Sequence, residues 1–378
     1  MSGARDPYLE PRHEALADKV RELGEKHLRA AAPGESDPAG RTREIAARLG
    51  ASGVLAAAVP PPHGSMDLRS IVVVREVLAY YSSLADAAFA VQGLGSHGLS
   101  LAGTDVQKGR WLPGVVRGET LCGFAATEPE AGSDLAAVRT AAVRDGGLFR
   151  LSGVKTFISN AGIAGLYTVL ARSSDAPGHR GLSLFLLDAD APGLSVRPLE
   201  PIAPHPLGEL RLEAAPAVLL GEEGKGYSLA LASLDAFRPG VGAAACGIAA
   251  RALDEALRHA LARRQFGRPL ADFQATRMAL ADMHAELQGA RLLVRHAAWT
   301  KDGGADRITR EGAVAKLVAT EMAQRVVDRA VQLHGGQGVM RGSTVERLYR
   351  EVRSLRIAEG TSEVLRLVIA KTLLKEKK

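Results

Sequence analysis

Apolar residues recur at helical spacing in the first and last thirds of the chain, whereas the middle third carries short, unbroken apolar runs. Helical periods are carried by four sets of positions: Leu16, Val20 and Leu23; Ile71, Val74, Leu78 and Tyr81; Met283, Leu287, Ala290, Val294 and Ala297; and Ala313, Leu317, Thr320, Gln324 and Val327. Each set places its apolar side chains on one face of a helix. The pattern therefore predicts helices at both ends of the chain.

The middle third predicts strands. Residues 148–151, 167–171 and 182–187 are runs of aliphatic and aromatic side chains separated by turn residues such as Asp145, Gly146 and Gly147. Strands at this spacing with no helix between them are typical of a small antiparallel barrel or sandwich.

Proline placement supports this division. Eight of the 18 prolines lie between Pro129 and Pro216, and only Pro239 and Pro269 follow. Because proline disrupts helix interiors, the last part of the chain can form long helices, with breaks expected at 237–240, 266–269, 302–304 and 334–338. An earlier break is expected at the prolines of 59–64. The predicted fold class is α+β, with an N-terminal helical domain (1–118), a middle antiparallel β-barrel or sandwich domain (119–221) and a C-terminal four-helix bundle (222–378).

Composition and charge exclude several classes. The net charge of +6 is spread as Lys and Arg alternating with Asp and Glu, so solvated helix faces are expected and a nucleic-acid partner is not. Cys122 and Cys246 are the only cysteines and are expected to be buried free thiols.

Residues 1–10 lack a secretory pattern, and no apolar run reaches the roughly 20 residues of a membrane span. A cytoplasmic location and no membrane partner are therefore expected, and the ten histidines form no cluster that predicts a metal site.

Four segments carry candidate chemistry, and each also has a purely structural interpretation. Residues 127–134 form a turn rich in backbone donors, and 154–162 place an aromatic and a hydroxyl two residues apart at a strand end. Residues 263–270 put arginines at a helix end, and 332–338 end a helix in glycines. Taken singly, residues 127–134 fit an ordinary loop and 154–162 a strand terminus. The arginines of 263–270 fit charges that complement a helix dipole, and 332–338 fit a helix C-cap.

A fifth segment, residues 357–363, precedes the final helix. Thr361 or Ser362 can cap that helix, and Glu363 suits its positive end. By itself, Glu359 reads as a solvated loop carboxylate.

Together, the five segments in this order resemble the acyl-CoA dehydrogenase family, from about residue 10 to residue 375. The resemblance implies FAD-dependent α,β-dehydrogenation of an acyl-CoA to the trans-2-enoyl-CoA, in carboxylic or fatty acid metabolism. Glu359 would be the catalytic base, and a hydride would pass to flavin N5. The thioester oxygen would accept bonds from the backbone N–H of Glu359 and from FAD. An electron-transfer flavoprotein would take the electrons, and the chain would form a homotetramer or homodimer.

The resemblance also implies individual binding residues. Those expected to bind FAD are Phe124, Ala126, Thr127, Gly132, Ser133, Phe157, Ile158, Ser159, Thr361 and Glu363. Those expected to contact the FAD of a neighbouring subunit are Arg263, Phe266, Gln274, Gln332, Gly335 and Gly336. Those expected to bind substrate are Ser133, Asp235, Arg238, Ala358 and Gly360, with Asp235–Arg238 at a helix start.

The sequence departs from the family pattern in places. Phe157 stands where the family usually has tryptophan, and Ser159 where it has threonine. Ala358 replaces the tyrosine that most often precedes the catalytic glutamate. Losing that ring should widen the acyl pocket, which predicts a branched, cyclic or aryl acyl group. Residues 60–65 and 203–208 also differ, with no consequence that the sequence defines.

Two rival interpretations remain at this level. A flavin oxidase or monooxygenase would share the fold, although the retained Glu359 argues against it. A non-catalytic helical scaffold would be colourless when purified, whereas a flavoenzyme is yellow.

Overall fold

The structure is a computed structural model of the 378-residue chain and describes residues 6–28 and 36–375. The chain forms two compact units. The first, here called the helical unit, comprises Met1–Pro33, Leu68–Asp86 and Arg238–Lys378, and the second, the sheet unit, comprises Gly34–Asp67 and Ala87–Phe237. The three-domain boundaries expected from the sequence remain a prediction.

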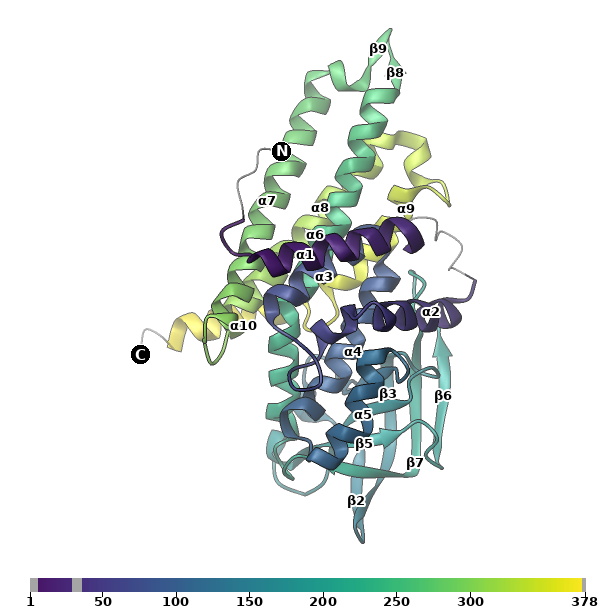
Figure 1. Cartoon of the computed structure of the whole chain (residues 1–378), viewed down its shortest axis with the longest axis vertical. Helices are drawn as coiled ribbons and strands as arrows, with labels where there is room; N and C mark the ends of the chain where they lie inside the picture. The colour runs from purple at the N-terminus through teal and green to yellow at the C-terminus, as the bar shows by residue number, and fades with distance from the viewer. Residues whose placement is uncertain (1–5, 29–35, 376–378) are drawn as a thin grey trace. The chain divides into compact units, whose positions relative to one another are not determined.

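The helical unit is a bundle of long helices (Figure 1). It contains α1 (Pro11–Leu23), η1 (Gly24–Leu28), α3 (Leu68–Tyr81), the beginning of α4 (Ser83–Ala102), α6 (Gly226–Ala262) from Arg238 on, α7 (Gln274–Asp302), α8 (Thr309–His334), α9 (Thr344–Arg353) and α10 (Ser362–Lys375). Helices α7 and α8 pack along each other, α8 also contacts α9 and α10, and α3 contacts α1 and α7. Alanines fill the buried face of α8, which lets its neighbours approach closely. The predicted C-terminal helical bundle is confirmed.

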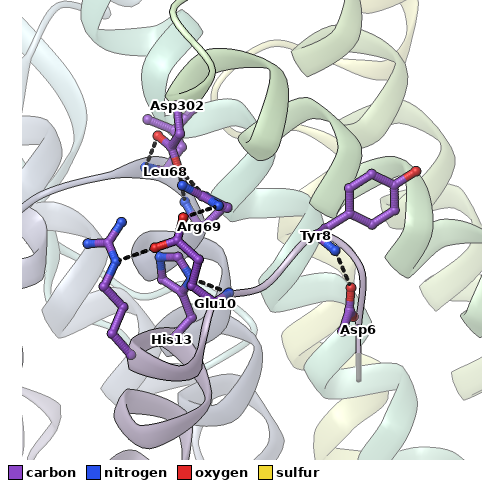
Figure 2. A network of polar contacts seen from close by, with 8 residues as sticks. Asp6, Tyr8, Glu10, His13, Leu68, Arg69 and Asp302 are labelled. Carbon is purple, nitrogen blue, oxygen red and sulfur yellow. Dashed lines mark hydrogen bonds and ion pairs between the residues drawn. The ribbon is translucent and has the colours of Figure 1, made fainter. Parts of the chain in front are cut away.

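The N-terminal end of the helical unit is held by a polar network (Figure 2). Glu10 and His13 form a capping box at the start of α1, and Glu10 also pairs with Arg69 at 2.7 Å. Asp302, at the end of α7, accepts the backbone N–H groups of Leu68 and Arg69 at 2.8 and 3.0 Å. Because these N–H groups have no partner within α3, the Asp302 carboxylate caps that helix from a distant part of the chain.

The described part of the sheet unit contains seven strands and several helical segments, among them the beginning of α6 up to Phe237. The others are α2 (Pro38–Ala51), η3 (Val54–Ala58), the rest of α4, α5 (Asp105–Arg117), β1 (Cys122–Ala125), β2 (Ala141–Asp145), β3 (Leu148–Ser159), β4 (Leu166–Arg172), β5 (Leu182–Asp188), β6 (Leu194–Leu199) and β7 (Leu207–Leu220), with short 3-10 turns between some of them. Pairing runs β4–β2–β3–β7–β5 and returns to β4, so five strands close a ring. β1 joins β4 in parallel and β6 joins β7. The predicted small barrel is confirmed.

Strands β4 and β5 are buried on both sides, which explains their unbroken apolar sequence. In β4, Tyr167 and Val169 belong to one core cluster, while Leu166 and Leu170 belong to another. The second cluster includes Leu99 of α4 and residues of α5, so these helices cover one face of the sheet. Because successive side chains of a strand point to opposite faces of the sheet, β4 contributes to both core clusters.

The predicted helix break at 237–240 is wrong. Helix α6 runs without interruption from Gly226 to Ala262 and contains Pro239 in its interior, so Asp235–Arg238 is not a helix start. Proline removes one backbone hydrogen bond, but Phe237 and Val241 on either side are almost completely buried. Their packing offsets the lost bond.

Candidate active site

Glu359 lies in a short loop between η8 (Ser354–Arg356) and α10, and its backbone is held from two sides. Arg238 of α6 donates to the carbonyl oxygen of Glu359 at 3.3 Å. Lys316 of α8, which is completely buried, donates to the carbonyl of Gly360 at 2.7 Å. Glu359 has a φ of 56°, a left-handed conformation that costs energy for a residue with a side chain. The two cationic side chains fix this strained backbone.

The Glu359 carboxyl is desolvated. Its Oε2 atom is buried and has no hydrogen-bond partner among the residues that the structure describes. Desolvation raises the pKa of Glu359, although the positive charges of Arg75, Lys316 and Arg238 act in the opposite direction. A carboxylate with a raised pKa is a stronger base near neutral pH than an exposed one. The arrangement therefore suits a general base.

The cap of α10 follows the expectation for this segment. The Thr361 hydroxyl accepts the backbone N–H of Val364 at 3.3 Å, so Thr361 acts as the cap. The Ser362 hydroxyl donates instead to Glu321 of α8. Glu363 lies in the first turn and is exposed, where its charge complements the helix dipole. The loop that carries Glu359 is thus anchored at both ends.

In the sheet unit, the end of β3 presents an aromatic ring. Phe157 has a φ of 56° and is 65% exposed, beside a register shift between Lys155 and Ile158. Ile158 points into the barrel core, while Ser159 Oγ lies 2.8 Å from His205 Nε2. A phenylalanine that is both strained and exposed gains nothing for folding. It has the form expected of a ring that covers a flat ligand.

The loop before β2 is fixed by a buried ion pair between Glu128 and Lys155. Lys155 Nζ donates to Glu128 Oε1 at 2.8 Å and to the Ala126 carbonyl at 3.0 Å. Glu128 also accepts the backbone N–H groups of Arg139 and Thr140. Desolvation acts to raise the pKa of Glu128, but Lys155 and these donors hold it below its usual range.

This ion pair positions the predicted cofactor residues of the loop. The Thr127 carbonyl accepts the N–H of Thr156 at 3.0 Å, which joins the loop to β3. Ala126 is buried and Phe124 is partly buried, whereas Gly132 and Ser133 are exposed. A Cβ at Gly132 would meet no atom within 4 Å. The exposed tip is open to a ligand that approaches the backbone.

A second group of predicted residues lies in the helical unit. The hairpin of β8 (Arg264–Gln265) and β9 (Arg268–Pro269) turns at Phe266 and Gly267, which both have positive φ. This geometry normally selects Asn-Gly, yet Phe266 occupies it with 92% of its surface exposed. As for Phe157, the folding of the chain does not explain why an exposed phenylalanine occupies position 266.

A cavity of about 630 Å³ lies near this hairpin. It brings together four predicted residues, Arg263, Gln332, Gly335 and Gly336, but Phe266 and Gln274 do not line it. Sequence reasoning missed His259, which also lines it and stacks on His334 with ring centroids 4.3 Å apart. Open space surrounds Gly335 and Gly336 where a side chain would stand. Arginine and exposed glycine backbone together suit a phosphate-bearing ligand.

These features fit the dinucleotide cofactor that the sequence implies. The exposed rings of Phe157 and Phe266 can cover flat groups, and the cavity can hold a pyrophosphate. Among the described residues, five other than glycine have positive φ, and three of them are Phe157, Phe266 and Glu359. Backbone strain therefore concentrates at positions that the sequence had already singled out.

Besides His259, four charged or polar residues near these sites were not predicted from the sequence: Arg75, Lys155, His205 and Lys316. Lys316 had a detectable signal, because it lies among alanines on the apolar face of a predicted helix. A lysine there must find a buried acceptor. Among the described residues, no group of three or more His, Cys, Asp or Glu side chains could hold a metal ion.

His205 should make the stability of the protein depend on pH. Desolvation lowers its pKa to about 4, so the folded protein holds a neutral ring that can bond Ser159. An unfolded histidine titrates near 6.5, so the folded state loses stability as the pH falls from about 6.5 to about 4. His205→Gln keeps a polar partner for Ser159 and does not titrate. Between pH 7.5 and pH 5, its melting temperature should fall less than that of the wild type.

The control for this comparison is His284→Gln, which changes an exposed histidine on α7. It should lose stability with falling pH as the wild type does. An equal loss in His205→Gln and His284→Gln would show that His205 is not desolvated.

Comparison with known proteins agrees with the geometry. The N-terminal, middle and C-terminal domain models of acyl-CoA dehydrogenases match residues 10–119, 123–215 and 224–374. A 3-(aryl)acrylate reductase of Clostridium sporogenes is 36% identical over 97% of this chain and 100% of its own length. A cyclohexane-1-carbonyl-CoA dehydrogenase of Geobacter metallireducens is 35% identical over 96% of this chain and 97% of its own. The solved butyryl-CoA dehydrogenase of Megasphaera elsdenii is 32% identical, with a TM-score of 0.91 over 98% of this chain and 100% of that one.

These matches define a class of FAD-binding oxidoreductases that act on CH–CH bonds of acyl-CoA thioesters. The chain belongs to the acyl-CoA dehydrogenase family. Its cofactor is FAD. The described part of the chain contains no helix long and apolar enough to cross a membrane.

Proposed function

We propose that this chain dehydrogenates an acyl-CoA at its α and β carbons, with Glu359 taking the α proton. The observation that carries this proposal is the Glu359 carboxyl itself, which is desolvated and lies on a backbone fixed by Arg238 and Lys316. An α proton of a thioester is weakly acidic, so a base of raised pKa must be held in a defined position. When bound, FAD accepts the hydride that leaves the β carbon.

The other site residues hold the reactants. The exposed ring of Phe157 would cover the flavin, and Ser159 and Thr127 lie on the backbone segments beside Phe157. Arg263, Gln332 and the glycines at 335 and 336 would bind the pyrophosphate of a FAD that a second subunit holds. This arrangement needs at least a homodimer, and a homotetramer is proposed.

The substrate proposed is an acyl-CoA with a branched, cyclic or aryl acyl group. Ala358 precedes Glu359 and is exposed, with a side chain of one carbon. A tyrosine at this position would fill space beside the base, so alanine leaves room for a bulky acyl group. Of the two relatives named above, one is named for the reduction of 3-(aryl)acrylates and the other for the dehydrogenation of cyclohexane-1-carbonyl-CoA, so both names include a ring.

Ala358→Tyr tests the substrate proposal. Wild-type kcat/KM should be higher for cyclohexanecarbonyl-CoA or 3-phenylpropanoyl-CoA than for butyryl-CoA. The added ring should reverse this order by about tenfold or more, because it occupies the widened space. Steady-state assays over this panel measure the change. Highest wild-type kcat/KM for butyryl-CoA, or an unchanged order in Ala358→Tyr, would contradict the proposal.

The electron acceptor proposed is an electron-transfer flavoprotein, and the proposed location is the cytoplasm. Cys122 and Cys246 are both buried free thiols, and the absence of a disulfide between them fits a reducing compartment.

A further inference from the structure

Four buried polar side-chain atoms of the helical unit have no hydrogen-bond partner among the described residues, and two of them belong to one site. One is Oε2 of Glu359 and the other is Nη1 of Arg75. Arg75, on α3, is only 3% exposed, so its guanidinium cannot be satisfied at the surface. A buried, unbonded donor is costly and calls for an explanation.

Asp86 fixes the direction of the Arg75 guanidinium. Nε and Nη2 of Arg75 donate to the two carboxylate oxygens of Asp86 at 2.7 and 2.9 Å. This bidentate ion pair uses the guanidinium edge formed by Nε and Nη2, so Nη1 points away from Asp86. Since Asp86 is 4% exposed, the pair is rigid and desolvated.

Arg75 and the Glu359 loop both contact residues in one turn of α6, although Arg238 and Gly240 lie on different sides of that helix. Arg238 bonds the Glu359 carbonyl, and two residues later Gly240 makes room for Arg75. A Cβ at Gly240 would lie 2.9 Å from Arg75 Nη1 and 2.8 Å from its Cδ. The charge of Arg75 is also the strongest of those that oppose the raised pKa of Glu359. The unbonded donor and the candidate base therefore border the same region.

We infer that Arg75 is a specificity residue, whose Nη1 donates a hydrogen bond to a neutral oxygen on the acyl group of the substrate. This inference rests on the proposed function and narrows it to acyl-CoAs that carry a hydroxyl or ketone oxygen. Asp86 already neutralises Arg75, and the nearby Glu359 carboxylate disfavours a second anion. A neutral acceptor satisfies Nη1 without adding a buried charge. A plain hydrocarbon group would leave it unbonded.

Matched substrates test the inference in the FAD-loaded enzyme. Cyclohexanecarbonyl-CoA is compared with its 3- and 4-hydroxy and 4-oxo forms, and 3-phenylpropanoyl-CoA with its ring-hydroxylated forms. At least one oxygenated acyl-CoA should exceed its parent by about tenfold or more in kcat/KM, the worth of one hydrogen bond to a charged donor.

Two variants then assign the preference to Arg75. Gly240→Ala should displace Nη1, and Arg75→Met combined with Asp86→Leu removes the pair without leaving a lone charge. Both should bring the ratio of oxygenated to parent substrate close to one. The matched controls are Gly289→Ala, where a Cβ meets no atom within 4 Å, and Arg291→Met with Glu76→Gln, another ion pair of α3. Both controls should keep the wild-type ratio.

The outcomes separate this inference from the proposed function. If the wild type oxidises the parent compounds at least as well as every oxygenated form, the inference is wrong and the dehydrogenase proposal stands. A preference that survives in Gly240→Ala and in the double variant also overturns it. Should a variant fail to fold, as seen by circular dichroism, the wild-type ratio and the other variant still decide. No oxidation of any acyl-CoA overturns the proposed function itself.

Discussion

Glu359→Gln is expected to lower the rate of flavin reduction by acyl-CoA by about 10²–10⁴-fold, the usual contribution of a positioned general base. The amide keeps the size of the side chain and leaves the bonds from Arg238 and Lys316 to the backbone intact. Substrate affinity should therefore change little. Stopped-flow spectroscopy measures the rate, and an acyl-CoA titration measures the affinity.

The pH dependence of the wild type gives a second view of the same group. The rate should rise with pH through the raised pKa of Glu359, because only the carboxylate can take a proton. A carboxyl whose folded pKa is raised destabilises the folded state above its unfolded pKa of about 4.3. Glu359→Gln should consequently melt at a higher temperature than the wild type at pH 7.5, with a smaller difference near pH 4.

The control is Glu351→Gln, which removes another buried carboxyl of the helical unit whose pKa burial also raises. Glu351 lies on α9 and is bonded to Arg347, outside the candidate site. This variant should keep the wild-type rate of flavin reduction. Equal losses of rate in both variants would show that the effect is structural and that Glu359 has no special role.

Lys155→Met should cost roughly 3–5 kcal/mol of folding free energy, because it leaves the Glu128 carboxylate buried without its counter-charge. Lys155 has no exposed surface, and Glu128 is 7% exposed. The loop at 126–134 should also lose its fixed position, so FAD affinity should fall together with stability. Denaturant titration of the FAD-loaded protein measures the first effect, and fluorimetric titration of the apoprotein with FAD measures the second.

Two further variants define the cause. Combining Lys155→Met with Glu128→Leu removes both charges and should recover much of the lost stability. Arg144→Met breaks an exposed ion pair with Glu223 in the same unit and should change stability by less than about 0.5 kcal/mol. A loss below about 1 kcal/mol in Lys155→Met would contradict a desolvated pair.

The periodicity of apolar residues was sufficient to predict most of the fold. The apolar runs of β4 and β5 and the helical repeats of α7 and α8 report burial directly, and burial follows the period of the element. The helix break predicted at Pro239 was wrong because the tendency of proline to end helices takes no account of the burial of Phe237 and Val241. Tertiary packing outweighed one missing hydrogen bond.

Site residues that lie in one short segment of the sequence could be predicted. Residues that only the fold brings to the site could not. Phe157, Phe266 and Glu359 stood out in local segments, and the structure finds strained backbone at each. Arg75 and Lys316 lie 284 and 43 positions before Glu359 in the sequence, on helices whose residues otherwise serve the core. Only folding shows that their charges reach the same carboxyl.

The role of Glu359 in acyl-CoA dehydrogenation is tested most directly by an anaerobic titration of the purified yellow protein with cyclohexanecarbonyl-CoA and 3-phenylpropanoyl-CoA, followed in the visible spectrum. At least one of these acyl-CoAs should bleach the flavin band and yield the corresponding 2-enoyl-CoA, and Glu359→Gln should show no comparable bleaching. A colourless protein with no affinity for FAD, or normal bleaching in Glu359→Gln, would contradict this role.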